Sequence, residues 1–330
     1  YGSVPVVAGI LYGIKPAVVA IVLAAAWRIG TRSLRNPVMI AIAIAAFLAI
    51  AVAGLPFPSI VLAAAIIGLI GGHKWPRLFQ VGGAPVHGSK ASYGPAIIDD
   101  TTPTPAHARF SSRRLLKVVF IAGGLGAAAW LLLASHYGAT HTLAQMGWFF
   151  TKAAMLTFGG AYAVLPYVYQ GGVEHYQWLT ATQMIDGLAL GETTPGPLIM
   201  IVAFVGFVGG WTHALFGHDS LLLAGVAGAA VATFFTFLPS FLFILAGGPL
   251  VESTRDNVRM TAPLTAISAA VVGVIVSLAV FFGRHVFLAG STVDWVALAI
   301  CAAACVALFK FKTGTITLIA ACALAGIVLA

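Results

Sequence analysis

The side chains that could do chemistry gather in one apolar stretch, between Trp148 and Met200. Lys152 lies inside an apolar helical run, and an ammonium at membrane depth is costly enough to indicate a functional site. Asp186 and Glu192 are acidic residues of the same stretch, and we interpret both as candidates for coupling ion movement to transport. The chain has neither an HExxH metal motif nor a GxSxG nucleophile motif, so we expect no enzyme and assign no catalytic residue.

Two breaks interrupt the apolar helices around these charges. The first is Phe158-Gly159-Gly160, and the second is Thr193-Thr194-Pro195-Gly196-Pro197. An unpaired backbone N–H or C=O costs several kcal/mol in hydrocarbon, so broken backbone at that depth must be covered by protein or line a water-filled cavity. Discontinuous helices of this kind are typical of transporter substrate sites.

The second break has the composition of a helix start that binds an anion. Thr194 can cap the helix, proline suits its first turn, and Gly196 lets a ligand approach the backbone. Free N–H groups and the positive end of the helix dipole favour negative charge there. We therefore expect the substrate to be bound by Lys152, Phe158, Gly159, Gly160, Glu192, Thr193, Thr194, Pro195, Gly196 and Pro197.

Each of these features also has a purely structural interpretation. Gly159 and Gly160 could serve close helix packing. Lys152 could pair with Glu192 or extend its ammonium to the membrane interface. Glu192 could do no more than interact with the dipole of the helix that follows it. The combination of both breaks with a buried lysine is more specific than any one of them.

Composition identifies the class of protein. Of 330 residues, 60% are hydrophobic and only 8% are charged, and the mean hydropathy is +1.01. These values predict an all-α, polytopic transmembrane bundle. The net charge of +8 is read as a topology signal, and no basic aromatic face indicates nucleic-acid binding. The cysteines and histidines lack the spacing of a metal site, and we expect neither a metal nor a cofactor.

Apolar windows long enough to cross the bilayer predict about 10 spans in two bundles. We expect a broken span near 143–169, and a re-entrant or interfacial helix over 171–190. The predicted organisation is the C-terminal part of a first membrane repeat (1–72), a basic cytoplasmic linker (73–114), one extra span that inverts the topology (115–142) and a second repeat that carries the site (143–330).

A weak internal repeat relates the two ends of the chain. One offset of 256 residues places Arg28 on Arg284, Ser59 on Thr315 and Leu62 on Leu318. The positive charges sit on opposite turns of the two copies, which predicts inverted repeats and leaves Arg284 as an exception to the positive-inside rule. We expect the first copy to lack its head, which would carry counterparts of the two breaks.

The stretches TFGGAYAVLP, VEHYQWLTATQMIDG and GLALGETTPGPLIM resemble the second homologous domain of the bacterial chromate ion transporter family. The resemblance runs from about Phe149 to the C-terminus, and the preceding spans resemble the end of that family's first domain. It implies a multi-pass inner-membrane carrier that expels chromate, a tetrahedral dianion similar to sulfate. The implied partners are this dianion, the lipid bilayer and the missing part of the first repeat, and a homo-oligomer is compatible with it. A carrier for sulfate or another oxyanion, and a non-transporting membrane subunit, stay open as alternatives.

The charge bias generates a topological prediction. Reporter fusions should place the His73–Lys117 linker and the Lys310–Lys312 turn in the cytoplasm, with Leu55-Pro56 and Ala330 outside. Finding Leu55 and Lys310 on the same side of the membrane would refute the inverted repeat.

Overall fold

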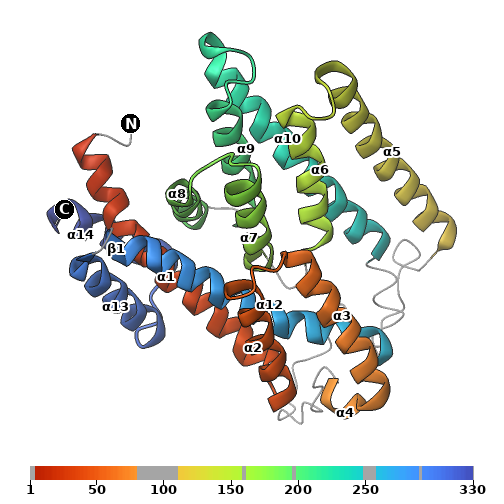
Figure 1. Ribbon diagram of the computed structural model, residues 1–330, viewed down its shortest axis with the longest axis horizontal. Helices are drawn as coiled ribbons and strands as arrows, with labels where there is room; N and C mark the ends of the chain where they lie inside the picture. Colours follow the sequence, from red (N-terminus) through yellow and green to blue (C-terminus); the bar gives the residue numbers. More distant parts are fainter. Residues whose placement is uncertain are drawn as a thin grey trace, which may run out of the picture.

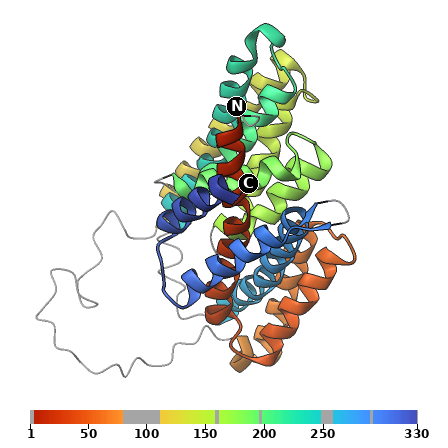
Figure 2. The same cartoon turned by 90° about the vertical axis from the view of Figure 1, so that its left-hand side faces the viewer.

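The computed structural model describes residues 4–79, 111–157, 161–194, 198–247, 258–289 and 292–329, and these are mostly helical (Figures 1 and 2). In this part of the chain, five helices are long and apolar enough to cross a membrane, and four shorter apolar helices accompany them. The predicted all-α, polytopic membrane fold is therefore confirmed.

The two ends of the chain contain matching sets of three helices. The N-terminal set is α1 (Pro5–Ser33), α2 (Pro37–Ala51) and α3 (Phe57–Lys74), followed by the short α4 (Pro76–Phe79). The C-terminal set is α12 (Val258–Phe287), a hairpin of β1 (Leu288–Ala289) and β2 (Thr292–Val293), α13 (Trp295–Phe309) and α14 (Thr315–Leu329). The offset of 256 residues superimposes the two sets to within a few residues at each helix end.

The middle of the chain forms a third group of helices beside these two sets. Helix α5 lies at the edge of the molecule, and no side chain in its apolar stretch is fully buried (Figure 1). The elements of this group are α5 (Ser112–Tyr137), α6 (Thr142–Met155), α7 (Ala161–Tyr169), the π-helix η1 (Gln170–His175), α8 (Ala181–Thr193), η2 (Leu198–Met200), α9 (Ile201–Thr212), η3 (His218–Ser220), α10 (Leu221–Leu242) and η4 (Phe243–Gly247).

The first helices of the two sets cross in opposite directions. A Cβ built on Gly283, late in α12, would lie 3.9 Å from a methyl group of Val19 in α1. A Cβ on Gly30, at the end of α1, would lie 3.4 Å from Val272, which is earlier in α12. Later residues of α1 therefore contact earlier residues of α12. The two helices are antiparallel, as inverted repeats require.

The long first helix of each set packs against the second and third helices of the other set. Helix α1 lies against α13 and α14, whereas α12 lies against α2 and α3 (Figure 1). Glycines permit backbone contact at these crossings, because a Cβ on Gly13 would overlap the carbonyl oxygen of Cys322, and one on Gly273 that of Ala43. The two sets are therefore interlocked.

Side-chain contacts show where two turns lie: the turn between α13 and α14, and the turn between α2 and α3. The ring of Trp27, near the end of α1, meets Phe309 edge-on at 6.2 Å, next to the turn that holds Lys310. The Gln170 side chain instead bonds both sides of the other turn, accepting from the Phe57 N–H at 2.8 Å and donating to the Leu55 carbonyl at 3.2 Å. This arrangement agrees with the predicted charge topology, which remains to be tested by reporters.

The crossings predict an asymmetric response to added methyl groups. Gly273→Ala should destabilise the protein by about 1–3 kcal/mol, because the Cβ meets backbone that cannot rotate away. Gly123→Ala in α5, where nothing lies within 4 Å, is the control and should be neutral or stabilise by up to about 1 kcal/mol through helix propensity. The measurement is thermal unfolding in detergent, and equal effects of both changes would contradict the interlocked packing.

Candidate functional site

Helices α6 and α7, which flank the first break in the sequence, form a hairpin. The rings of Phe149 in α6 and Tyr167 in α7 stack with centroids 4.8 Å apart and planes 12° from parallel. In one continuous helix these residues would be about 27 Å apart. The prediction of a single broken span over 143–169 is therefore wrong, because the chain reverses direction between the two helices.

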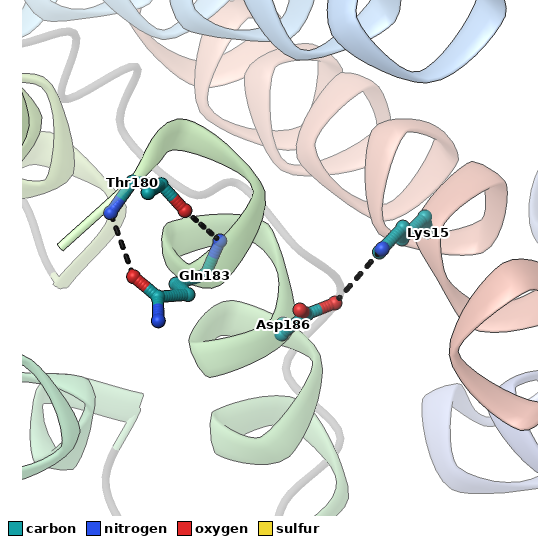
Figure 3. Close-up of polar contacts among 4 residues, drawn as sticks. All are labelled: Lys15, Thr180, Gln183 and Asp186. Carbon is teal, nitrogen blue, oxygen red and sulfur yellow. Dashed lines mark hydrogen bonds and ion pairs between the residues drawn. The ribbon is translucent and has the colours of Figure 1, made fainter. Parts of the chain in front are cut away.

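Helices α8 and α9 form a second hairpin around the second break. A Cβ on Gly187 in α8 would overlap the ring of Phe204 in α9, although a straight helix would separate them by about 25 Å. Helix α8 begins with a reciprocal capping box, in which the Thr180 hydroxyl accepts from the Gln183 N–H and the Gln183 side chain accepts from the Thr180 N–H (Figure 3). The helix expected over 171–190 is thus divided into η1 and α8.

One hydrogen bond joins the inner ends of the two hairpins. The Tyr162 hydroxyl, in the first turn of α7, donates to the carboxylate of Glu192, in the last turn of α8. Arg28 of α1 interacts electrostatically with both residues. Residues that flank the two breaks therefore meet, although the breaks are about thirty residues apart in the chain.

The remaining predicted residues have different outcomes. Thr194 ends α8, and its hydroxyl donates to the Leu190 carbonyl at 2.7 Å. Its capping role for the next helix stays a prediction. Outside the described residues lie Phe158, Gly159, Gly160, Pro195, Gly196 and Pro197, together with the side chain of Thr193.

Lys152 lies over an aromatic ring of its own helix, and its role in substrate binding stays a prediction. Its ammonium lies 5.5 Å from the centre of the Trp148 ring, one turn earlier in α6. Trp148 is more than half exposed and contacts Trp130 of α5. Lys152 makes no ion pair with Glu192, whose carboxylate is bound by Tyr162 instead. The cation–π contact holds Lys152 on the α5 side of α6.

Asp186 has a partner that the sequence analysis did not consider. Its Oδ1 atom lies 3.6 Å from the ammonium of Lys15 in α1, with side-chain exposures of 17% and 26% (Figure 3). The same oxygen is buried and accepts no hydrogen bond within the described residues. Lys15 interrupts the first apolar span as Lys152 interrupts a later one, so the same signal was present in the sequence.

Three polar side chains of α1 therefore face acidic residues of the second repeat. Besides Lys15 and Arg28, the Tyr12 hydroxyl contacts both carboxylate oxygens of Asp294 at 2.8 Å. Asp294 also caps α13, because it accepts from the Ala297 N–H at 2.9 Å. Among the described residues, no group of three or more His, Cys, Asp or Glu side chains could hold a metal ion.

The ion pair generates a stability prediction. Lys15→Gln or Asp186→Asn alone should cost about 3 kcal/mol, because each leaves one charge without its partner in a low-dielectric site. The double change should recover most of that loss. Unfolding free energies in detergent test this, with the exposed Lys310→Gln as a control for general charge removal. Additive single effects would show that the pair contributes no coupling.

Comparison with known proteins identifies the family. The chain matches the chromate transporter family over residues 1–69 and 144–327, which is more than half of its length. It is 32% identical over 143 residues to the chromate transport protein of Cupriavidus metallidurans, covering 43% of this chain and 32% of that protein. It is 40% identical over 124 residues to the chromate transport protein of Pseudomonas aeruginosa, covering 38% and 26% of the two chains.

A further relative carries no named substrate. An uncharacterized transporter of Methanocaldococcus jannaschii is 29% identical over 144 residues, covering 44% of this chain and 31% of that one. No solved structure matches the chain. The chain spans about a third of the length of the relatives named here. With its apolar helices and the family match over both ends, this multi-pass membrane protein belongs to the chromate transporter family.

Proposed function

We propose that this chain is the anion-binding part of an inner-membrane carrier that exports chromate. The observation that carries the proposal is the hydrogen bond between Tyr162 and Glu192, both of which interact electrostatically with Arg28. The breaks with anion-binding composition lie within a few residues of that meeting point in the sequence. Both named relatives with a stated cargo are chromate transport proteins, which supports chromate as the substrate.

A site built from helix starts suits a dianion, because its hydrogen-bond donors are backbone N–H groups and not flexible charged side chains. Backbone N–H groups at helix starts bind anions through fixed dipoles, so they need little reorganisation when the ligand arrives. A dianion in the low-dielectric interior also needs positive charge nearby. Arg28 takes this role in the proposal in place of Lys152, because Arg28 is the cation that interacts with the Tyr162–Glu192 pair. The planar guanidinium can bind two oxygens of a tetrahedral oxyanion at once.

The two carboxylates are the proposed coupling groups. Glu192 competes with the anion for Arg28, and Asp186 competes for Lys15 one to two turns earlier on α8. Loading of the site therefore changes the electrostatic partners of α8, the helix that carries the second break. A proton or another cation that neutralises either carboxylate would favour anion binding by the same competition.

Sulfate is the main alternative substrate, because it has the shape and charge of chromate. The relative with no named cargo shows that sequence similarity extends beyond proteins named for chromate. Competition on purified, full-length protein separates the two: chromate should displace bound sulfate at lower concentration than sulfate displaces chromate. The reverse order would identify a sulfate carrier.

Direction is tested separately from binding. Everted inner-membrane vesicles that contain the full-length protein should accumulate chromate, because export from the cell becomes uptake into such vesicles. Binding without flux in either orientation would indicate a non-transporting subunit.

The geometry of the site predicts which cation matters. Arg28→Gln should weaken chromate binding at least tenfold, since charge-assisted hydrogen bonds contribute about 1.5–3 kcal/mol and 1.4 kcal/mol is tenfold. Lys152→Gln is the matched control and should change the affinity less than twofold, because its ammonium lies over Trp148. Dissociation constants from equilibrium dialysis provide the measurement. A greater loss of affinity for Lys152→Gln would indicate that the anion binds near Lys152 and not near Arg28.

A further inference from the structure

A polar cavity lies at the end of α7 opposite to Tyr162. Its volume is about 240 Å³, several times the roughly 30 Å³ that one water occupies in the liquid. Helices α2, α7, η1 and α12 surround it, and its polar lining side chains are Tyr169, Gln170, Glu174, Ser277 and Arg284. Gln170 also holds the α2–α3 turn at the same place, so the rim of the cavity is fixed by hydrogen bonds.

Arg284 is the cation of this cavity, and its charge is not used elsewhere. It makes no ion pair or hydrogen bond to any described residue, and Glu174 lines the same cavity without reaching ion-pair distance. Arg284 also opposes the charge bias of the chain, because the predicted topology places it outside. Arg284 is exposed and lines this cavity, so its guanidinium is accessible to a ligand.

The 256-residue offset relates Arg284 to Arg28, and each arginine has a tyrosine and a glutamate in its neighbourhood. Arg28 interacts with a tyrosine and a glutamate, Tyr162 and Glu192. Arg284 shares its cavity with Tyr169, which interacts electrostatically with Glu174. The two tyrosines lie at the first and last turns of α7, so one short helix connects two clusters of arginine, tyrosine and glutamate.

We propose that the cavity at Arg284 is a second oxyanion-binding site, at the extracytoplasmic end of the route that begins at Arg28. The inference rests on the proposed function and extends it, by adding a site that can hold the anion after it has left the site at Arg28. The ligand class is a tetrahedral dianion, held by the guanidinium with Ser277 and Gln170 as neutral hydrogen-bonding partners. Glu174 limits the affinity by like-charge repulsion, which allows the anion to leave.

Binding stoichiometry tests this proposal on the full-length protein in detergent, with chromate and sulfate as probes in equilibrium dialysis. Wild type should bind two anions per chain at saturation, and Arg284→Gln should bind one. Glu174→Gln should retain both and bind the weaker one at least threefold more tightly. Lys310→Gln removes an exposed cation at the other end of the frame and should leave both sites unchanged.

A second variant protects the test against loss of folding. Ser277→Phe fills the cavity while keeping Arg284, and it should lose the same anion as Arg284→Gln. One anion per chain in wild type, or two in Arg284→Gln, would overturn the second site and leave the proposed carrier intact. Absence of chromate and sulfate binding in wild type would overturn the proposed function and this inference together.

Discussion

Broken backbone inside a membrane must be covered, and the arrangement of this protein follows from that constraint. An N–H or C=O that leaves its helix finds no water in hydrocarbon, so the protein itself has to surround the interruption. Here the two helices that flank the first break pack side by side, and α8, which precedes the second break, packs against α1, α12 and α14. The long helices provide the enclosure in which short and interrupted helices are tolerated.

Helix α1 links this enclosure to the charged groups. It buries an apolar segment from Ala17 to Val22 at the crossing, and it carries Tyr12, Lys15 and Arg28 on either side of that segment. Tyr12 and Lys15 contact acidic residues of the second repeat, and Arg28 interacts electrostatically with Glu192. The helix that belongs to one repeat therefore supplies the counter-charges for the other, and neither repeat has a complete polar interior by itself.

Much of the fold could be predicted from the sequence because hydropathy and charge act locally. Apolar windows predicted most of the helices. The 256-residue offset matched α1 with α12, and the structure shows that these two helices cross. The hairpins could not be predicted. A Gly-Gly or Pro-Gly sequence indicates that a helix ends, but it does not indicate the direction of the next helix. Contacts such as Phe149–Tyr167 and Gly187–Phe204 reveal the reversal.

The candidate site was predicted less completely, for a different physical reason. Long cationic side chains choose among many rotamers, so the position of Lys152 in the chain did not determine that it would lie over Trp148. Lys15 and Arg28 were reachable from sequence as charges in or beside an apolar span, but their acidic partners lie more than 150 residues away. Such pairings depend on the helix crossings, which local patterns do not encode.

The exchange of partners between the two helix sets has a consequence for the origin of the fold. A lone set of three helices would expose the faces of α1 and α12 that now lie against the other set's pair. Those faces can be buried by a second copy only if that copy enters the membrane upside down. A single-repeat ancestor with this packing would have needed to insert in both orientations and assemble as an antiparallel dimer, and gene fusion would later have fixed one copy in each orientation.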